Sequence, residues 1–243
     1  MIAIEAKELT KKYKGITAVD GLNLMIEQGE LFALLGVNGA GKSTTIKLLS
    51  CLAKPTSGDA LLLGDSIIDS SQAVKQKINV SPQETAVAPN LTVRENLELI
   101  YGIYGHNREK AKEKTAEMIE SFNMAEIAEQ RAKTLSGGWQ RRLSIALALI
   151  SEPEILFLDE PTLGLDVIAR RELWKIITEL NGKITIILTT HYMEEAQTLA
   201  DRIGIMSKGR LMALGTADEL MKEAKTESFE DAFLYFVGKE AVI

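Results

Sequence analysis

The sequence has little of what marks secreted, membrane-spanning or nucleic-acid-binding proteins. Its 243 residues include one cysteine, Cys51, which excludes both an internal disulfide and a zinc site built from cysteines. We interpret Cys51 as a small buried apolar residue in a reducing compartment. Positive charge is also scarce, because 28 Lys and Arg stand against 34 Asp and Glu and leave a formal net charge of -6. This balance disfavours non-specific nucleic-acid binding.

Long hydrophobic runs are missing as well. The longest apolar stretches, residues 143–150 and 184–188, fall far short of the roughly 20 residues that cross a bilayer. The N-terminus has no basic segment followed by an apolar one, which a secretory signal would need. We therefore expect a chain that does not span a membrane and stays in the cytosol.

The residues that are present indicate a folded α/β domain. The chain is 46% hydrophobic and 26% charged, and its 18 Gly and 5 Pro show no period, which excludes disorder and collagen. Apolar strand candidates alternate with helical segments, as in an α/β core. The strand candidates are residues 3–9, 22–26, 31–35, 60–63, 78–80, 155–158, 184–189, 203–206 and 211–214. Residues 155–158 are apolar throughout, which is typical of a parallel strand covered on both faces.

The segment between residues 92 and 150 has a different pattern, with helical periodicity and no strand candidate. We predict an α/β core of residues 1–83 and 151–220, an inserted helical lobe of residues 84–150 and a short helical tail of residues 221–243. Residues 91–104 hold more apolar side chains than one helical face can bury, which predicts an exposed patch for a partner. The alternative is that the lobe's own helices bury them all.

A glycine-rich loop follows the strand candidate 31–35 and precedes an apolar helix predicted over residues 45–52. Its pattern is that of a phosphate-binding loop, in which backbone N–H groups and a helix N-terminus face the phosphates. A glycine-rich turn without a ligand is the minor interpretation. Lys42 is predicted to reach the β and γ phosphates, and Ser43 to offer its hydroxyl to Mg²⁺. The predicted nucleotide-binding residues of the loop are Gly36, Asn38, Gly39, Ala40, Gly41, Lys42, Ser43 and Thr44.

An acidic pair, Asp159 and Glu160, ends the apolar strand 155–158. Ligands of open α/β sheets lie at the carboxyl ends of the strands. Asp159 is predicted to hold Mg²⁺, and Glu160 to position the attacking water as a general base. The alternative, an acidic pair that caps a helix near Pro161, loses its weight beside a phosphate loop.

A second glycine-rich segment opens the amphipathic helix predicted over residues 141–150. It comprises Ser136, Gly137 and Gly138, and Ser136 is predicted to be the N-cap of that helix. Two glycines at a helix start also leave backbone N–H groups open to an anion. Since the chain already has one phosphate loop, this second site suits a nucleotide that is held elsewhere.

Together these motifs resemble the nucleotide-binding domain of ABC transporters, over nearly the whole chain. The resemblance implies a RecA-like P-loop NTPase core with an N-terminal antiparallel β subdomain and an inserted helical lobe. It also implies that two copies pair head to tail, so that the Ser136–Gly138 signature of one closes on the ATP held by the other. Trp139 departs from the Gln that is usual after this signature.

The same resemblance assigns further roles by position. Tyr13 is similar to the aromatic residue that stacks on adenine, the alternative being an ordinary edge-strand tyrosine. Gln83 matches the residue that contacts Mg²⁺ and the attacking water, and His191 matches the switch histidine at the γ-phosphate. Asp166 lies in a segment that resembles the loop reporting from one ATP site to the other.

These roles imply an ATPase subunit that drives a separate transmembrane permease from the cytoplasmic face of the membrane, without nucleic acid as a partner. Residues 228–234 resemble endings in the separate-subunit branch that exports drugs, antibiotics and polysaccharides. One alternative is a soluble ABC ATPase in an assembly role, such as iron-sulfur cluster biogenesis. Another is a P-loop kinase or GTPase, against which the signature and His191 argue.

Overall fold

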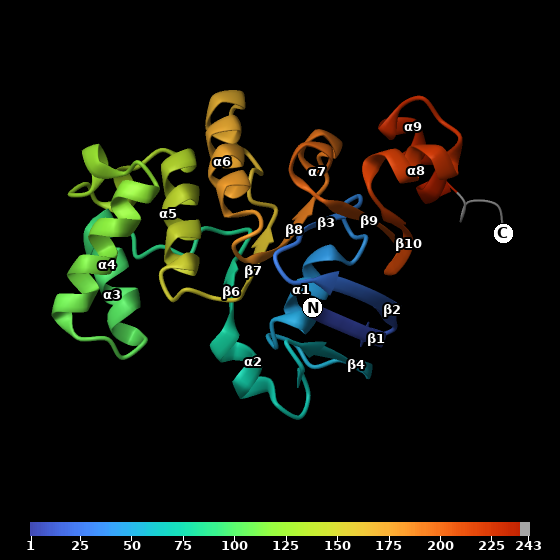
Figure 1. The fold of residues 1–243 in the computed structure, drawn as a ribbon, viewed down its shortest axis with the longest axis horizontal. Coiled ribbons are helices and arrows are strands. Elements are labelled where there is room, and N and C mark those ends of the chain that lie inside the picture. Colours follow the sequence, from blue (N-terminus) through green and yellow to red (C-terminus); the bar gives the residue numbers. More distant parts are fainter. Residues whose placement is uncertain (239–243) are drawn as a thin grey trace.

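Two sheets form the centre of the structure, a computed structural model that describes residues 1–238. The six-stranded sheet has the order β10-β9-β3-β8-β7-β6, and its neighbours are parallel except for the β9–β10 pair. An antiparallel sheet of order β2-β1-β4-β5 lies beside it (Figure 1). The α/β class with an N-terminal antiparallel subdomain is therefore confirmed. The strands are β1 Ile2–Tyr13, β2 Ile16–Glu27, β3 Leu31–Leu35, β4 Ser57–Leu62, β5 Asp65–Ser66, β6 Ile78–Ser81, β7 Ile155–Asp159, β8 Thr185–Thr190, β9 Arg202–Ser207 and β10 Arg210–Gly215.

The central strands are buried on both faces, as their continuous apolar sequences predict. Successive side chains of a strand point to opposite faces. In β7, Leu156 and Leu158 join the hydrophobic cluster under the lobe and the C-terminal helices. Ile155 and Phe157 join the second cluster, against the antiparallel sheet and the first helix. Two hydrophobic layers thus cover both faces of the sheet, and polar functional side chains can gather only at the ends of its strands.

Four helices cover the sheet between its strands. Helices α1 (Lys42–Leu49) and α2 (Ser71–Lys77) lie on the side of the antiparallel subdomain, and α6 (Val167–Leu180) and α7 (Met193–Leu199) lie on the other side (Figure 1). Helix α1 begins three residues earlier than predicted, because its first turn is polar and lacks the apolar period. The polar helix α2 was not predicted, for the same reason. After α1, Cys51 adopts a left-handed conformation (φ 57°) and is half-buried, not fully buried as expected.

The lobe consists of α3 (Val93–Ile103), α4 (Arg108–Ser121) and α5 (Gly137–Leu149), with short 3-10 turns at Ala125–Ile127 and Ala132–Thr134. Each helix begins at a side-chain cap, which is Thr92 for α3, Asn107 for α4 and Ser136 for α5. None of the helices within residues 1–238 is long and apolar enough to cross a membrane.

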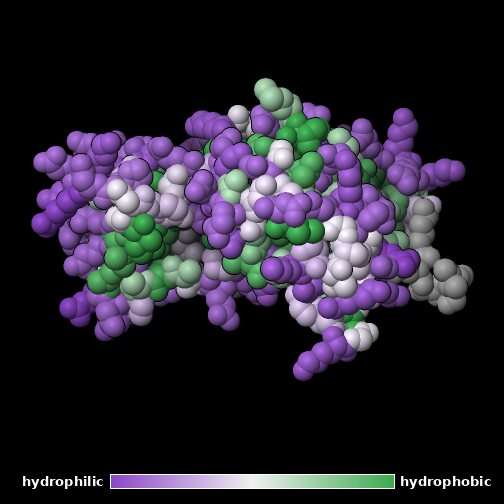
Figure 2. Space-filling model, turned by 90° about the horizontal axis from the view of Figure 1, so that it is seen from below, coloured by the Kyte–Doolittle hydropathy of each residue, from purple (hydrophilic) through white to green (hydrophobic). Residues whose placement is uncertain are grey.

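Helix α3 leaves part of its apolar surface exposed. Val93 and Leu97 are fully buried, whereas Leu99 is 46% exposed, Ile103 69% and Tyr104 49%. Figure 2 shows hydrophobic side chains gathered over this end of the molecule. The alternative in which the lobe buries all of these side chains is therefore wrong.

The C-terminal segment differs from the predicted tail. It forms two helices, α8 (Ala217–Ala224) and α9 (Phe229–Gly238), and the predicted boundary at residue 221 falls inside α8. Leu220 and Phe236, each 1% exposed, belong to the core cluster under the sheet. The two helices are thus packed onto the core domain. Residues 239–243 of the predicted tail lie outside the described residues.

Candidate functional site

The phosphate loop joins the carboxyl end of β3 to α1, and its glycines are required by the backbone. A Cβ at Gly36 would collide with the carbonyl oxygen of Met206, and one at Gly41 with that of Ala18. Gly41 also has φ +105° and serves as the N-cap of α1 without a side-chain cap. The N-terminus of α1 therefore faces the loop with its backbone donors, an arrangement that suits an anion.

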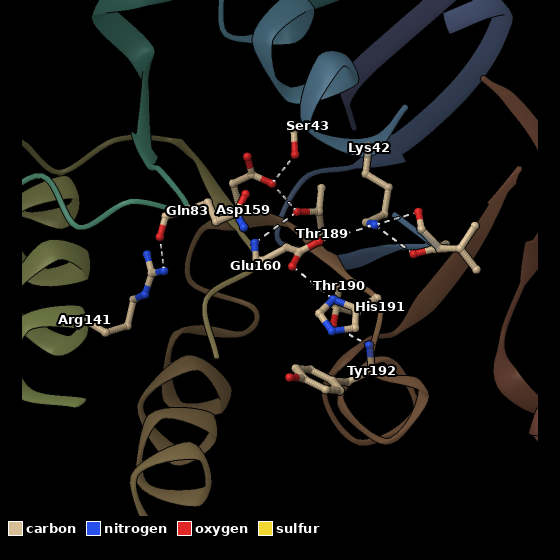
Figure 3. Close-up of polar contacts among 12 residues, drawn as sticks. Lys42, Ser43, Gln83, Arg141, Asp159, Glu160, Thr189, Thr190, His191 and Tyr192 are labelled. Atoms are coloured by element: carbon tan, nitrogen blue, oxygen red, sulfur yellow. Dashed lines mark hydrogen bonds and ion pairs between the residues drawn. The ribbon is translucent and has the colours of Figure 1, made fainter. Parts of the chain in front are cut away.

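Lys42, the first residue of α1, is held inside this loop. Its Nζ donates to the carbonyl oxygens of Gly36 at 2.8 Å and Val37 at 3.2 Å, and lies 3.4 Å from Oε1 of Glu160 (Figure 3). The side chain is only 4% exposed. The ammonium group is thus fixed at the mouth of the loop, where the resemblance places the phosphates.

Asp159 is fixed by two hydroxyl groups. Its Oδ1 accepts from Ser43 Oγ at 3.0 Å and from Thr189 Oγ1 at 2.6 Å. The parallel register of β7 and β8 places Thr189 directly opposite Asp159. A hydroxyl and a carboxylate side by side are oxygen donors of the kind that Mg²⁺ takes together with substrate phosphates. These residues fit the ion, although residues 1–238 contain no cluster of three or more His, Cys, Asp or Glu side chains around a metal site.

Glu160 lies between two nitrogen groups. Its Oε1 faces Lys42, and its Oε2 is 3.0 Å from Nδ1 of His191. Its backbone is left-handed, with φ 47°, and its N–H donates to both the carbonyl and the hydroxyl oxygen of Thr189 at 3.1 Å. Such a conformation is strained for a residue other than glycine and persists where the surroundings hold it. The strain and the bonds together aim this carboxylate at the mouth of the loop.

A cavity of about 720 Å³ opens above these groups, a size that suits a nucleotide. Ten of the predicted site residues line it: Asn38, Gly39, Ala40, Gly41, Lys42, Ser43, Thr44, Gln83, Glu160 and His191. Five lining residues were not predicted: Ile16, Thr17, Ala18, Leu163 and Lys208. Leu163 begins the segment in which only Asp166 was assigned a role, and the other four belong to a turn and a strand start that carry no motif, so their position could be found only from the fold.

Tyr13 and Asp166, two other predicted site residues, are not among those that line the cavity. Tyr13, at the end of β1, is 44% exposed, and its ring centroid is 4.9 Å from Nζ of Lys11. Asp166 caps α6 and accepts from the N–H groups of Ile168 and Ala169 at 2.9 Å. Their roles toward a nucleotide remain predictions.

The signature is also separate from the cavity. Ser136 is the N-cap of α5 and accepts from Trp139 N at 3.5 Å, as predicted. Ser136 and Gly137 are exposed, and an added Cβ at Gly137 would meet nothing within 4 Å. Trp139 stacks against Arg142, whose Cζ is 4.3 Å from the ring centroid. Within one chain, therefore, the phosphate loop and the signature do not form a single site.

Two buried ionisable side chains near the site were not predicted. Arg141 is 4% exposed and contacts the loop that carries Gln83. Burial lowers its pKa, and the charges of Asp159 and Glu195 oppose that shift. Glu195 on α7 is fully buried, and burial raises its pKa. Its Oε1 accepts from Nε1 of Trp174 at 3.0 Å, and the side chains of Thr190, Thr162 and Trp174 oppose the rise in its pKa.

Comparison with known proteins places this geometry in a family. Residues 19–163 match the family described as ABC transporter. The chain is 42% identical over 240 residues to the probable multidrug ABC transporter ATP-binding protein YbhF of Escherichia coli (strain K12). This alignment covers 96% of the chain but only 41% of YbhF, so the chain spans less than half the length of that relative. It is also 42% identical over 219 residues to the daunorubicin/doxorubicin resistance ATP-binding protein DrrA of Streptomyces peucetius. That alignment covers 90% of the chain and 66% of DrrA.

A solved structure is similar over most of its length. It is the ATP-binding cassette MJ0796, described as a dimer in a post-hydrolysis state bound to ADP and Pi. It superimposes with a TM-score of 0.79 at 28% sequence identity, over 88% of this chain and 98% of that one. The fold around the cavity is thus one that holds the products of ATP hydrolysis in a similar protein.

Proposed function

This chain belongs to the ABC transporter family, and on that premise we propose that it hydrolyses ATP to drive a separate membrane-spanning partner. The observation that carries the proposal is the convergence of two triads at one cavity. Ser43, Asp159 and Thr189 form one, and Lys42, Glu160 and His191 form the other. The relatives named for drug resistance support an exporter, with the chain as its peripheral subunit on the cytoplasmic face of the membrane.

In the proposed reaction, the N-terminus of α1 and the ammonium of Lys42 bind the β and γ phosphates of ATP. Phosphate oxygens compete with Glu160 for Lys42 and so free that carboxylate to accept a proton. A water molecule then attacks the γ-phosphorus, the bond between the β-phosphate oxygen and this phosphorus breaks, and Glu160 takes the proton from the water. His191 orients the carboxylate through Oε2.

Mg²⁺ would be held by Ser43 and Asp159, with Gln83 nearby, and when bound it neutralises charge on the phosphate oxygens. Thr189 keeps Asp159 in place, because its hydroxyl donates to the same carboxylate oxygen that Ser43 contacts. Tyr13 is proposed to stack on the adenine at the open side of the cavity, next to Ile16, its partner across β1 and β2.

The exposed signature supports a dimer. Ser136, Gly137 and Gly138 lie at the start of α5 and do not line the cavity of their own chain, so we place them on the ATP held by a second copy. Two ATP molecules would then lie in the interface, with Asp166 close to the boundary between the copies. The dimeric description of the similar cassette agrees with this arrangement.

The exposed end of α3 supports a permease contact. Leu99 and Ile103 border a groove of about 490 Å³ between α3 and α4. The exposed Tyr104 follows Ile103 at the end of α3. Exposed apolar clusters of this kind mark partner sites. The lobe that carries the signature would then also receive the membrane-spanning partner.

The test uses the chain together with its detergent-solubilised permease. Ile103→Glu should abolish transport and co-purification while the ATPase activity of the isolated chain stays within about twofold, since Ile103 lies outside the cavity. Leu234→Glu, on α9 and 58% exposed, is the matched control and should leave both properties unchanged. Normal transport by Ile103→Glu would refute the surface. Co-purification with soluble scaffold proteins instead of a membrane protein would refute the transport role and favour an assembly ATPase.

A further inference from the structure

Arg141 connects the lobe to the cavity through a pair of backbone contacts. It lies in α5, and its Nη1 donates to the carbonyl oxygen of Pro82 at 2.5 Å. Its Nη2 donates to the carbonyl oxygen of Gln83 (Figure 3). The two partners are 59 and 58 residues away in the chain. A guanidinium holds its donors in a rigid plane, so two successive carbonyl groups are fixed relative to α5 at once.

The energetics indicate more than packing. Arg141 is 4% exposed and forms no ion pair with a carboxylate within the described residues, although the charges of Asp159 and Glu195 act on it. Burial of an arginine without a direct counter-ion is unfavourable unless its hydrogen bonds are well made. A loop that only needed its carbonyl groups satisfied could use water, because Gln83 itself is exposed.

The neighbouring arginine shows what an ordinary structural role looks like. Arg142 donates to the carbonyl oxygen of Phe122 at 3.2 Å and to Glu172 at 2.7 Å, and it stacks on Trp139. Its partners lie in the lobe and on α6, none of them at the cavity. Of the two adjacent buried arginines, only Arg141 reaches a segment that lines the nucleotide cavity.

We propose that Arg141 is a positioning residue that fastens the Gln83 loop to the signature helix. The N-terminus of α5 carries Ser136–Gly138, so the orientation of Gln83 at the cavity and the placement of the signature toward a second copy change together. This inference rests on the proposed function for its catalytic consequence. The link itself is a property of the chain without nucleotide.

The first experiment measures amide hydrogen exchange of the nucleotide-free chain by mass spectrometry. Arg141→Met should raise the exchange rate of a peptide covering residues 82–88 by about tenfold, because the carbonyl anchors of the loop are lost. Arg142→Met, the control, removes the neighbouring guanidinium, which is also buried, and should leave that peptide unchanged. Exchange at the parent rate in Arg141→Met would overturn the proposal, whatever the ATPase assay shows.

Arg141→Lys decides the matter if the methionine variant does not fold. It keeps the charge but replaces the planar fork by a single ammonium, so exchange of residues 82–88 should lie between that of the parent and that of an unanchored loop. Parent-like exchange together with parent-like kinetics in Arg141→Lys would overturn the proposal, since the fork would then have no role.

The second experiment is a double-mutant cycle on the ATPase reaction. Arg141→Met should lower kcat about 10- to 100-fold and change the KM for ATP less than about twofold, because the loop is displaced while the phosphate loop is intact. In a Gln83→Ala background the same substitution should lower kcat less than about twofold, since its effect passes through Gln83. For Arg142→Met and Gln83→Ala, by contrast, the fold-changes in kcat should multiply in the double variant. Multiplicative behaviour of Arg141→Met would overturn the positioning role, and an inactive parent would overturn only the proposed function.

Discussion

The cavity in the α/β core and the signature on the lobe differ in how their polar groups are satisfied. Lys42, Asp159 and Glu160 are each less than 10% exposed, and each is paired with groups of the same chain. Ser136 and Gly137 are exposed, and Ser136 contacts only the helix that it caps. The core thus pairs its polar groups within one chain, whereas the lobe presents exposed donors for which we propose a ligand held by another chain.

The largest expected effect is on ATP binding by the cavity, and it comes from replacing Lys42. Lys42→Ala is expected to weaken ATP binding at least about 100-fold, roughly 3 kcal/mol, because a buried charge on the phosphates is lost. Titration calorimetry of the isolated chain measures it. Lys47→Ala, at an exposed position of the same helix, should bind like the parent. If Lys42→Ala bound ATP with the affinity of the parent, the assignment of the nucleotide site to the α/β core would be wrong.

That variant also tests the packing of the loop. The sequence predicts only that Lys42 reaches the phosphates, whereas the structure also buries it against the carbonyl oxygens of Gly36 and Val37. Its loss leaves these groups unpaired, so the melting temperature should fall by a few degrees as well. Lys42→Met, which keeps the aliphatic stem, separates the loss of charge from the loss of packing.

The next largest effect is on dimerisation, and it tests the cavity and the signature separately. Glu160→Gln with ATP and Mg²⁺ should double the mass seen by light scattering, because the clamped dimer no longer turns over. Adding Ser136→Arg should return it to a monomer, while ATP affinity changes less than about twofold, since Ser136 lies outside the cavity.

Glu113→Arg, an exposed position on α4, controls for the added charge. If Glu160→Gln stays monomeric with saturating ATP, both alone and with the intact transporter, the head-to-tail dimer is wrong. If Ser136→Arg still dimerises, the signature is not the lobe's contribution to the interface.

The smallest expected effect is on the pH dependence of folding stability, and it arises from the buried Glu195. Burial raises the folded-state pKa of Glu195 above its ordinary value of 4.5, so this carboxyl keeps its proton longer in the folded chain. Its contribution to stability is complete below pH 4.5 and is lost as the pH rises through the folded-state pKa. Glu195→Gln should remove this slope, which cannot exceed about 1.4 kcal/mol per pH unit.

Urea unfolding between pH 4 and pH 8 measures the difference, with the variant gaining on the parent as the pH rises. Gln retains an acceptor for Trp174, so the hydrogen bond to the indole persists. Glu194→Gln, at the exposed neighbouring position, should follow the parent curve. Parallel curves for Glu195→Gln and the parent would show that folding does not change the pKa of this carboxyl.

Local patterns predict those parts of the fold whose cause is local. Strand β3 was predicted with its observed bounds, because all five of its residues are apolar and buried. The start of α1 was placed too late, because Lys42, Ser43 and Thr44 are polar although the backbone donors of the site begin there. Arg141 was missed because an arginine in an amphipathic helix is usually solvated, and the carbonyl groups that bury it lie far away in sequence.

The register between β7 and β8 restricts where this chain can change in length. An extra residue in either strand would turn the side chain opposite Asp159 to the other face of the sheet, so the 2.6 Å contact with Thr189 could not form. The turn between α3 and α4, around the exposed Gly105, has no such partner across a sheet. Insertions and deletions should therefore accumulate in the lobe, the part that we propose contacts a membrane-spanning partner, while strands β7 and β8 keep their length.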